Sequence, residues 1–208
     1  MLNIFEIIGT VAFAVSGALT GIKKRLDFFG VLMLAITTAI GGGIARDLII
    51  GNTPPLAFRH PIYITIALVS TVGVWIFYRY LFRLTNVILI FDAIGLAVFT
   101  ANGARLAFAG DYASLSVAVS LGVLTGTGGG ILRDIFVQEI PMVFRKEIYA
   151  TASIIGVLAQ YYSRIFFHGS WPLYICFATT LLIRLIAMNF KMNLPVPKIN
   201  NRDINNDF

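Results

Sequence analysis

The chain has 208 residues, of which 58% are apolar and only 12% are charged, and its mean hydropathy is +0.84. A soluble domain is nearer half apolar and a quarter charged, so this composition excludes a soluble protein and indicates an integral membrane protein. The net charge of +6 could suggest nucleic acid, but an excess of basic residues in a membrane protein more often reflects orientation, and we expect no nucleic-acid partner.

Hydropathy predicts an all-α membrane protein with seven spans and short loops, at about 20 residues for each span. The first apolar run contains Glu6 and lacks a basic region before it, so we interpret it as a retained span and not as a signal peptide. The predicted spans are residues 4–22, 29–50, 61–82, 87–108, 114–137, 147–167 and 172–190.

The distribution of basic residues predicts the orientation of the spans. Ten lysines and arginines fall on one side of them and three fall on the other. Cytoplasmic loops carry such an excess, so we expect an external N-terminus and a cytoplasmic C-terminus in a bacterial inner (plasma) membrane. Lys23, Lys24 and Arg25 belong to this signal, and a second interpretation is that they bind anionic lipid headgroups.

One phrase, Gly-Gly-Gly-Ile-x-Arg-Asp, occurs twice, at residues 41–47 and 128–134. The match extends further at an offset of 86 residues, where Glu6, Gly9, Phe13, Ile62 and Tyr63 correspond to Asp92, Gly95, Phe99, Ile148 and Tyr149. We therefore predict two three-helix repeats and a seventh helix, and the second repeat is inverted because three spans are an odd number. Inverted repeats place a functional site near the membrane midplane, between the halves. The predicted units are residues 1–86, 87–167, 168–190 and a polar cytoplasmic tail, 191–208.

The two glycine triplets allow two interpretations. Consecutive glycines loosen a helix, and backbone carbonyls exposed at a kink can replace part of an ion's hydration shell in a water-filled path. Small residues also let two helices pack closely. Packing is the better explanation for any one glycine, but for two symmetric triplets we favour kinks that border a path. The predicted kink residues are Gly41, Gly42, Gly43, Gly128, Gly129 and Gly130.

The arginine and aspartate after each triplet are candidate path-lining or helix-holding charges. Adjacent residues point about 100° apart on a helix, so Arg46 and Asp47 need not pair with each other. We expect pairs across the repeat instead, Arg46 with Asp134 and Arg133 with Asp47, lining two vestibules. The alternative is that these ion pairs simply anchor helix ends at the membrane interface.

Four further polar residues correspond between the repeats. Glu6 and Asp92 lie near the start of a span on opposite faces, where carboxylates could concentrate cations at two entrances. They could equally be solvated at the interface, or be partners of Arg133 and Arg46. Ser16 and Asn102 lie mid-span, where each could line a path or satisfy a neighbouring backbone group.

The sequence offers little for catalysis or cofactors. His60 and His168 are isolated and do not suggest a metal site, and Cys176 is the single cysteine, in an apolar run. No Ser/His/Asp or Cys/His grouping has supporting context. We therefore predict that the protein is not an enzyme and has no catalytic residue, metal or cofactor.

These residues and motifs resemble the prokaryotic trimeric intracellular cation (TRIC) channels, over about residues 3–190. The resemblance rests on the three-plus-three-plus-one plan and on the doubled Gly-Gly-Gly-Ile-x-Arg-Asp phrase. It implies a homotrimer with a pore inside each protomer, bordered by spans 1, 2, 4 and 5, and it implies potassium and sodium as permeant ions. Animal members carry a Lys-Glu-Val stretch in the fourth span that is linked to gating and lipid binding. Residues 92–104 have no counterpart, so that gating account is not carried over.

A second function stays open. Related bacterial sequences are described as transporters of small amino acids, specifically glycine. A transporter needs one occluded site that alternates between the two sides, and inverted repeats are the usual way to build one. The symmetry thus favours a transporter, whereas the family resemblance favours a channel.

Overall fold

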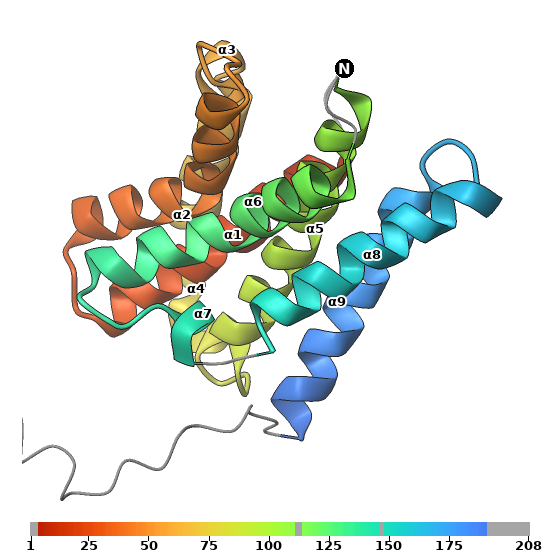
Figure 1. The fold of residues 1–208 in the computed structure, drawn as a ribbon. Coiled ribbons are helices and arrows are strands. Elements are labelled where there is room, and N and C mark those ends of the chain that lie inside the picture. The colour runs from red at the N-terminus through yellow and green to blue at the C-terminus, as the bar shows by residue number, and fades with distance from the viewer. Residues whose placement is uncertain (1–3, 111–113, 146–147, 191–208) are drawn as a thin grey trace, which may run out of the picture.

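The computed structural model describes residues 4–110, 114–145 and 148–190, and within these ranges it contains helices and no strand (Figure 1). An all-helical membrane fold was the prediction, and it is confirmed. The helices are α1 (Ile4–Lys23), α2 (Phe28–Ile49), α3 (Leu56–Arg59), α4 (Ile62–Leu81), α5 (Val87–Ala109), α6 (Leu115–Phe136), α7 (Met142–Arg145), α8 (Ala150–Phe166) and α9 (Trp171–Asn189).

The long helices begin and end within three residues of the predicted spans. Six of those in the described ranges are long and apolar enough to cross a membrane. The exception is α8, whose 17 residues rise about 25 Å at 1.5 Å for each residue, less than the ~30 Å of a bilayer core. The seventh span therefore stays a prediction. The short helices α3 and α7 were not predicted.

The two halves of the chain pack in the same way. In the first half α1 contacts α2 and α4, and α2 contacts α3 and α4; in the second half α5 contacts α6 and α8, and α6 contacts α7 and α8. The halves meet where α1 packs on α5 and α2 packs on α6. Helix α9 lies outside this scheme, beside α8 at the edge of the bundle (Figure 1). This correspondence supports the predicted repeat, while its boundary at residue 86 stays a prediction.

Corresponding side chains begin the two central helices. The Asp27 carboxylate accepts a hydrogen bond from the Gly30 amide at 2.7 Å, and the Ser114 hydroxyl accepts one from the Val117 amide at 3.3 Å. Each cap satisfies an amide that has no partner within its own helix. Helices α2 and α6 therefore start at matching positions of the repeat, and this sets the same register for both glycine triplets.

Corresponding residues also meet at the centre of the bundle. The rings of Phe13 on α1 and Phe99 on α5 stack with their centroids 5.3 Å apart. Glycines make room for them, because a Cβ atom at Gly95 would overlap the Phe13 ring and one at Gly9 would lie 3.1 Å from the Phe99 ring. The halves thus pack about a pseudo-two-fold axis that passes between these rings.

Both glycine triplets lie within uninterrupted helix. The middle glycines are the points where α2 and α6 touch, since a Cβ atom at Gly42 would overlap the carbonyl oxygen of Thr125 and one at Gly129 would overlap that of Thr38. Thr38 and Thr125 correspond in the repeat. The packing interpretation of the triplets therefore describes a contact that is present, and the predicted kinks stay a prediction.

Candidate functional site: two polar clusters

The arginine of each repeated phrase binds the aspartate that follows it. Nε and NH2 of Arg46 donate to Asp47 Oδ1 at 2.9 and 2.8 Å, and Nε of Arg133 donates to Asp134 Oδ1 at 2.9 Å. The predicted cross-repeat pairs are therefore wrong. The angle between adjacent residues on a helix is real, but the long arginine stem bends across it and reaches the neighbouring carboxylate.

The second oxygen of each aspartate holds the chain that follows. Asp47 Oδ2 accepts a hydrogen bond from the Leu56 amide at 2.7 Å, where α3 begins, and Asp134 Oδ2 accepts one from the Met142 amide at 2.9 Å, where α7 begins. Both aspartates are buried. Each therefore fixes its arginine and folds a loop back against the end of its helix.

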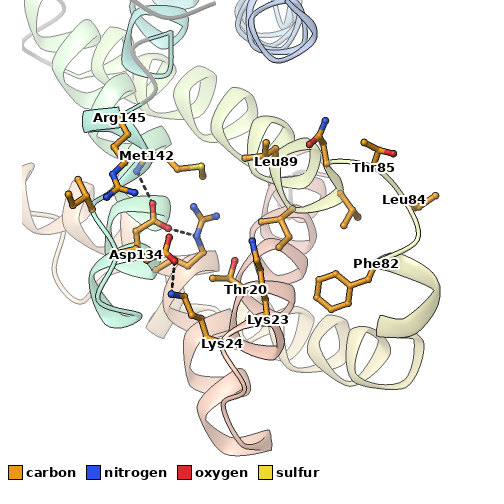
Figure 2. A pocket seen from close by; sticks show the side chains of 16 residues that line it. Thr20, Lys23, Lys24, Phe82, Leu84, Thr85, Leu89, Asp134, Met142 and Arg145 are labelled. Atoms are coloured by element: carbon orange, nitrogen blue, oxygen red, sulfur yellow. Dashed lines mark hydrogen bonds and ion pairs between the residues drawn. The ribbon is translucent and has the colours of Figure 1, made fainter. Parts of the chain in front are cut away.

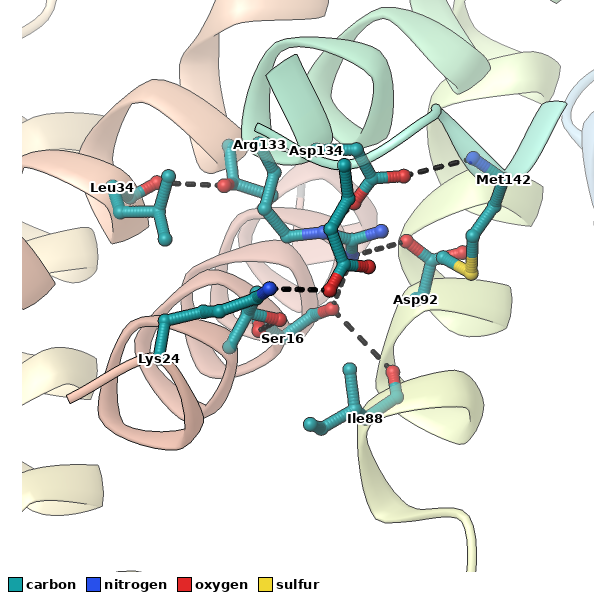
Figure 3. A network of polar contacts seen from close by, with 11 residues as sticks. Ser16, Lys24, Leu34, Ile88, Asp92, Arg133, Asp134 and Met142 are labelled. Carbon is teal, nitrogen blue, oxygen red and sulfur yellow. Dashed lines mark hydrogen bonds and ion pairs between the residues drawn. The ribbon is translucent and has the colours of Figure 1, made fainter. Parts of the chain in front are cut away.

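The Asp92 cluster, which we define as Ser16, Asp92, Arg133, Asp134 and Tyr149, contains a buried ion pair (Figure 3). NH1 of Arg133 lies 2.6 Å from Asp92 Oδ1 and donates to the Ser16 hydroxyl, also at 2.6 Å. Asp92 is fully buried and Arg133 is 1% exposed. Of the interpretations given for Asp92, these contacts bear out its role as a partner for Arg133.

The Glu6 cluster, which we define as Glu6, Arg46, Asp47, Tyr63 and Asn102, occupies the corresponding place in the other half. The Glu6 carboxylate accepts hydrogen bonds from the Tyr63 hydroxyl and, at 2.9 Å, from Asn102 Nδ2. The half-exposed Arg105 approaches it to 3.7 Å. Its arginine, Arg46, pairs with Asp47 alone among the described ion pairs. Glu6 and Asn102 thus come together, but Glu6 and Arg46 form no ion pair.

The third glycine of each triplet faces one of these clusters. Gly43 lines a pocket of about 40 Å³ together with Glu6 and Arg46. A Cβ atom at Gly130 would lie 2.8 Å from the Tyr149 hydroxyl and 3.4 Å from Asp92 Oδ1. Each triplet therefore combines a packing residue in the middle with a residue at the end that leaves room beside buried charge.

A cavity of about 540 Å³ reaches the Asp92 cluster (Figure 2). Arg133 and Asp134 line it together with the basic residues Lys23, Lys24 and Arg145. Two of the three residues predicted for lipid headgroups therefore border a hollow, whereas Arg25 is not among its lining residues and adopts a left-handed backbone conformation with φ of 60°. Lipid binding by this group stays a prediction.

An ion pair crosses the rim of this cavity and gives a pH-dependent prediction. Nζ of Lys24 lies 2.5 Å from Glu139, which follows α6, and the hydrogen bond from Lys24 lowers the pKa of the Glu139 carboxyl below its ordinary value. Any stability from this pair is fully present above the pKa that Glu139 has in the unfolded chain. It is lost as the pH falls through the lower pKa that Glu139 has in the folded protein. We expect Lys24→Met to raise the Glu139 titration midpoint, as followed by carbon NMR of the labelled carboxyl. An unchanged midpoint would show that the pair does not persist in solution.

Sequence reasoning missed three residues of these clusters and their surroundings. Tyr63 and Tyr149 correspond in the repeat, and this match was the signal that could have identified them. Arg184 on α9 is buried, donates from NH1 to the Ile148 carbonyl at 3.3 Å, and lies 4.7 Å from the centre of the Tyr149 ring. A single arginine in the unrepeated helix had no comparable signal.

Comparison with known proteins places the chain among bacterial membrane proteins. A family model described as "Glycine transporter" matches residues 3–79 and 89–164. The inner membrane protein YadS of Escherichia coli K12, of the group called UPF0126, is 41% identical over 195 residues, which cover 91% of this chain and 93% of that one. A UPF0126 membrane protein of Vibrio cholerae is 41% identical over 202 residues, 94% of this chain and 82% of its own length.

Solved membrane-protein structures are also similar to this chain in fold and in sequence. A structure from work on conductance through TRIC cation channels superposes with a TM-score of 0.87 at 37% identity, covering 96% of this chain and 98% of its own. The TRIC orthologue from Rhodobacter sphaeroides gives a TM-score of 0.85 at 33% identity, covering 91% and 97%. Each likeness covers more than nine tenths of this chain.

Proposed function

We propose that this chain forms a path for monovalent cations, potassium or sodium, inside each protomer of a homotrimer. The chain belongs to the TRIC family of membrane proteins, which the glycine-transporter model also describes. The likeness to the solved TRIC cation channels over nearly the whole chain carries the proposal. A helical fold of this kind has to satisfy its backbone internally within the membrane, so polar groups at depth gather where they face protein or water. The two clusters are such places.

The charges of the clusters favour weak binding of monovalent cations. Glu6 borders a small pocket, and within the described ranges its carboxylate oxygens are engaged only by neutral donors and by an arginine at 3.7 Å. Asp92 is neutralised by Arg133. Conduction requires binding that is favourable enough for entry and weak enough for exit. A half-compensated carboxylate beside a path meets that condition better than a free one.

The proposal includes an orientation and a set of bordering residues. The basic cavity beside Lys23 and Lys24 would face the cytoplasm, in accordance with the positive-inside rule, and the Glu6 cluster would face the outside. The path would run between the two clusters, past the stacked rings of Phe13 and Phe99. Ser16 and Asn102 would then contribute their polar groups beside the path.

Purified protein in liposomes provides the test. We expect voltage-driven potassium flux that rises with concentration without saturation, because a continuous path with weak sites does not turn over one solute at a time. Liposomes prepared identically with Glu6→Gln protein should conduct less, since this change removes the charge and keeps the shape. Absence of potassium flux from well-folded protein would contradict the proposal.

The alternative is a secondary transporter of a small amino acid such as glycine, which the description of the family model favours. The unequal hollows beside the two clusters, about 540 and 40 Å³, also resemble a protein that opens to one side at a time. In the same liposomes, saturable glycine uptake coupled to sodium or protons, without potassium conductance, would establish the transporter instead of the channel.

A further inference from the structure

The two polar clusters contain corresponding residues that make different bonds. In the Asp92 cluster the arginine binds the carboxylate, since Arg133 lies 2.6 Å from Asp92. In the Glu6 cluster the tyrosine binds the carboxylate, since the Tyr63 hydroxyl donates to Glu6 Oε2. The partner that each carboxylate lacks, Tyr149 for Asp92 and Arg46 for Glu6, is present beside it. Two equivalent sites are thus in two different states.

The atoms left without partners identify the missing bonds. Among the described residues, Asp92 Oδ2 and the Tyr149 hydroxyl are both buried and lack a hydrogen-bond partner. They are the equivalents of Glu6 Oε2 and the Tyr63 hydroxyl, which are bonded to each other. A buried polar group without a partner destabilises the fold, so a rearrangement that joins them is favourable at that point.

The same correspondence explains a third unpaired atom. Asn102 Oδ1 is buried without a partner. Asn102 corresponds to Ser16, whose hydroxyl oxygen accepts a hydrogen bond from Arg133 at 2.6 Å. Asn102 Oδ1 is therefore the acceptor that Arg46 would use if it took the position that Arg133 has now. Three of the unpaired buried atoms thus belong to one alternative arrangement.

We propose that the protein exchanges between two states in which these arrangements change places. In the state described here, Arg133 holds Asp92 and Ser16, while Tyr63 and Asn102 hold Glu6. In the other state, NH1 of Arg46 binds Glu6 and Asn102 Oδ1 while its Nε stays on Asp47, as Nε of Arg133 now stays on Asp134. Tyr149 then takes the Asp92 carboxylate that NH1 of Arg133 releases. In each state one carboxylate is thus held by the arginine of its own cluster and the other by the tyrosine of its own cluster.

The hollows beside the clusters agree with this exchange. The cavity of about 540 Å³ lies on the side where the arginine holds the carboxylate, and the pocket of about 40 Å³ lies on the side where the tyrosine holds it. They share no lining residue. In the exchanged state the sizes would be reversed, so the site beside Glu6 would open while the site beside Asp92 closes.

Pseudo-symmetry also keeps the two states close in free energy. The same kinds of bond, an arginine–carboxylate pair on one side and a tyrosine–carboxylate bond on the other, exist in both. A ligand or an ion that prefers one state then needs only a small difference in affinity to shift the population. The inference rests on the proposed path through the protomer, but it does not depend on which solute uses that path.

Removal of a single hydroxyl from either tyrosine tests the exchange, because the two changes have opposite expected effects. Tyr63→Phe removes a bond of the present state and should favour the exchanged state. Tyr149→Phe removes a hydroxyl that meets no hydrogen-bond partner among the described residues in the present state and bonds Asp92 in the exchanged one, so it should favour the present state. One lost hydrogen bond corresponds to a shift of about fivefold in the ratio of the states.

Thiol labelling in lipid nanodiscs measures this ratio from both sides. In a Cys176→Ala background, Thr10→Cys reports on the Glu6 pocket and Thr20→Cys reports on the large cavity. We expect Tyr63→Phe to increase the labelling rate at position 10 and decrease it at position 20, by up to about fivefold. Tyr149→Phe should do the reverse. The readout requires no transport, so it is separate from the liposome test of the proposed function.

Two controls keep the result interpretable. Ser16→Ala removes an acceptor of Arg133 that is used only in the present state, so it should act like Tyr63→Phe although it lies in the other cluster. A surface cysteine at Phe190, which is 69% exposed and lines neither hollow, should label at the same rate in all variants and monitors the folded protein. Labelling that changes in the same direction for both tyrosine variants, or in neither, would overturn the exchange.

Discussion

Replacement of Arg133 by methionine is expected to lower the free energy of unfolding by about 3–5 kcal/mol. Arg133 is buried between Asp92 and Asp134, at 2.6 and 2.9 Å. Methionine keeps much of the stem and removes the charge, so both carboxylates remain in the interior without their cation. Thermal unfolding in detergent, followed by tryptophan fluorescence, measures the loss.

The repeat supplies a matched control for this variant. Arg46→Met removes an equally buried arginine that pairs with one carboxylate, Asp47, which also keeps its hydrogen bond from Leu56. We expect a loss of about 1–3 kcal/mol. Addition of Asp92→Asn to Arg133→Met should recover part of the stability, because it removes one of the stranded charges. Equal losses for Arg46→Met and Arg133→Met would contradict the unequal bonding of the two clusters.

Gly129→Ala is the second variant with a large expected effect. The added methyl group would overlap the carbonyl oxygen of Thr38 and lie 3.2 Å from the Phe13 ring. The first of these is backbone, which cannot turn aside as a side chain does, so α2 and α6 would have to separate. Overpacking of this kind typically costs about 1–3 kcal/mol and sometimes more, which the same unfolding measurement detects.

Gly43→Ala provides the comparison. It makes the same chemical change within the corresponding triplet, yet its nearest neighbour would be Arg46 NH2 at 3.9 Å, an ordinary contact. Alanine is also a better helix former than glycine by about 1 kcal/mol. We expect unchanged or slightly increased stability. A loss as large as that of Gly129→Ala would mean that the triplets act through helix flexibility and not through contact between α2 and α6.

Hydropathy and the repeated phrase were sufficient to predict the long helices and to identify which residues correspond. Length and apolar character decide where a helix can cross a bilayer, and both are visible in the sequence. The four-residue helices α3 and α7 could not be predicted, because so short an element has no period to detect. They form where Asp47 and Asp134 bind the amides of Leu56 and Met142, which are contacts between separate segments.

The partners within the site were harder to predict than its members. The repeat identified Glu6, Asp92 and both arginines, but symmetry suggested pairs between the repeats, and the arginine stems turn to the adjacent aspartates instead. The repeat matched Tyr63 with Tyr149, but the sequence does not show what their hydroxyls contact. Their role depends on which hydroxyl reaches a carboxylate, and this is decided by packing among α1, α4, α5 and α8.

The bonds from Asp47 and Asp134 to the start of α3 and α7 also restrict the length of the chain between them. Each carboxylate closes a ring of fixed circumference through residues 48–55 or 135–141, so an inserted residue would have to break the bond or bulge outward. Residues 82–86, the described connection between α4 and α5, have no such side-chain bond. Insertions among relatives should therefore be rare in the two clasped loops and commoner in that connection, whatever the solute that crosses.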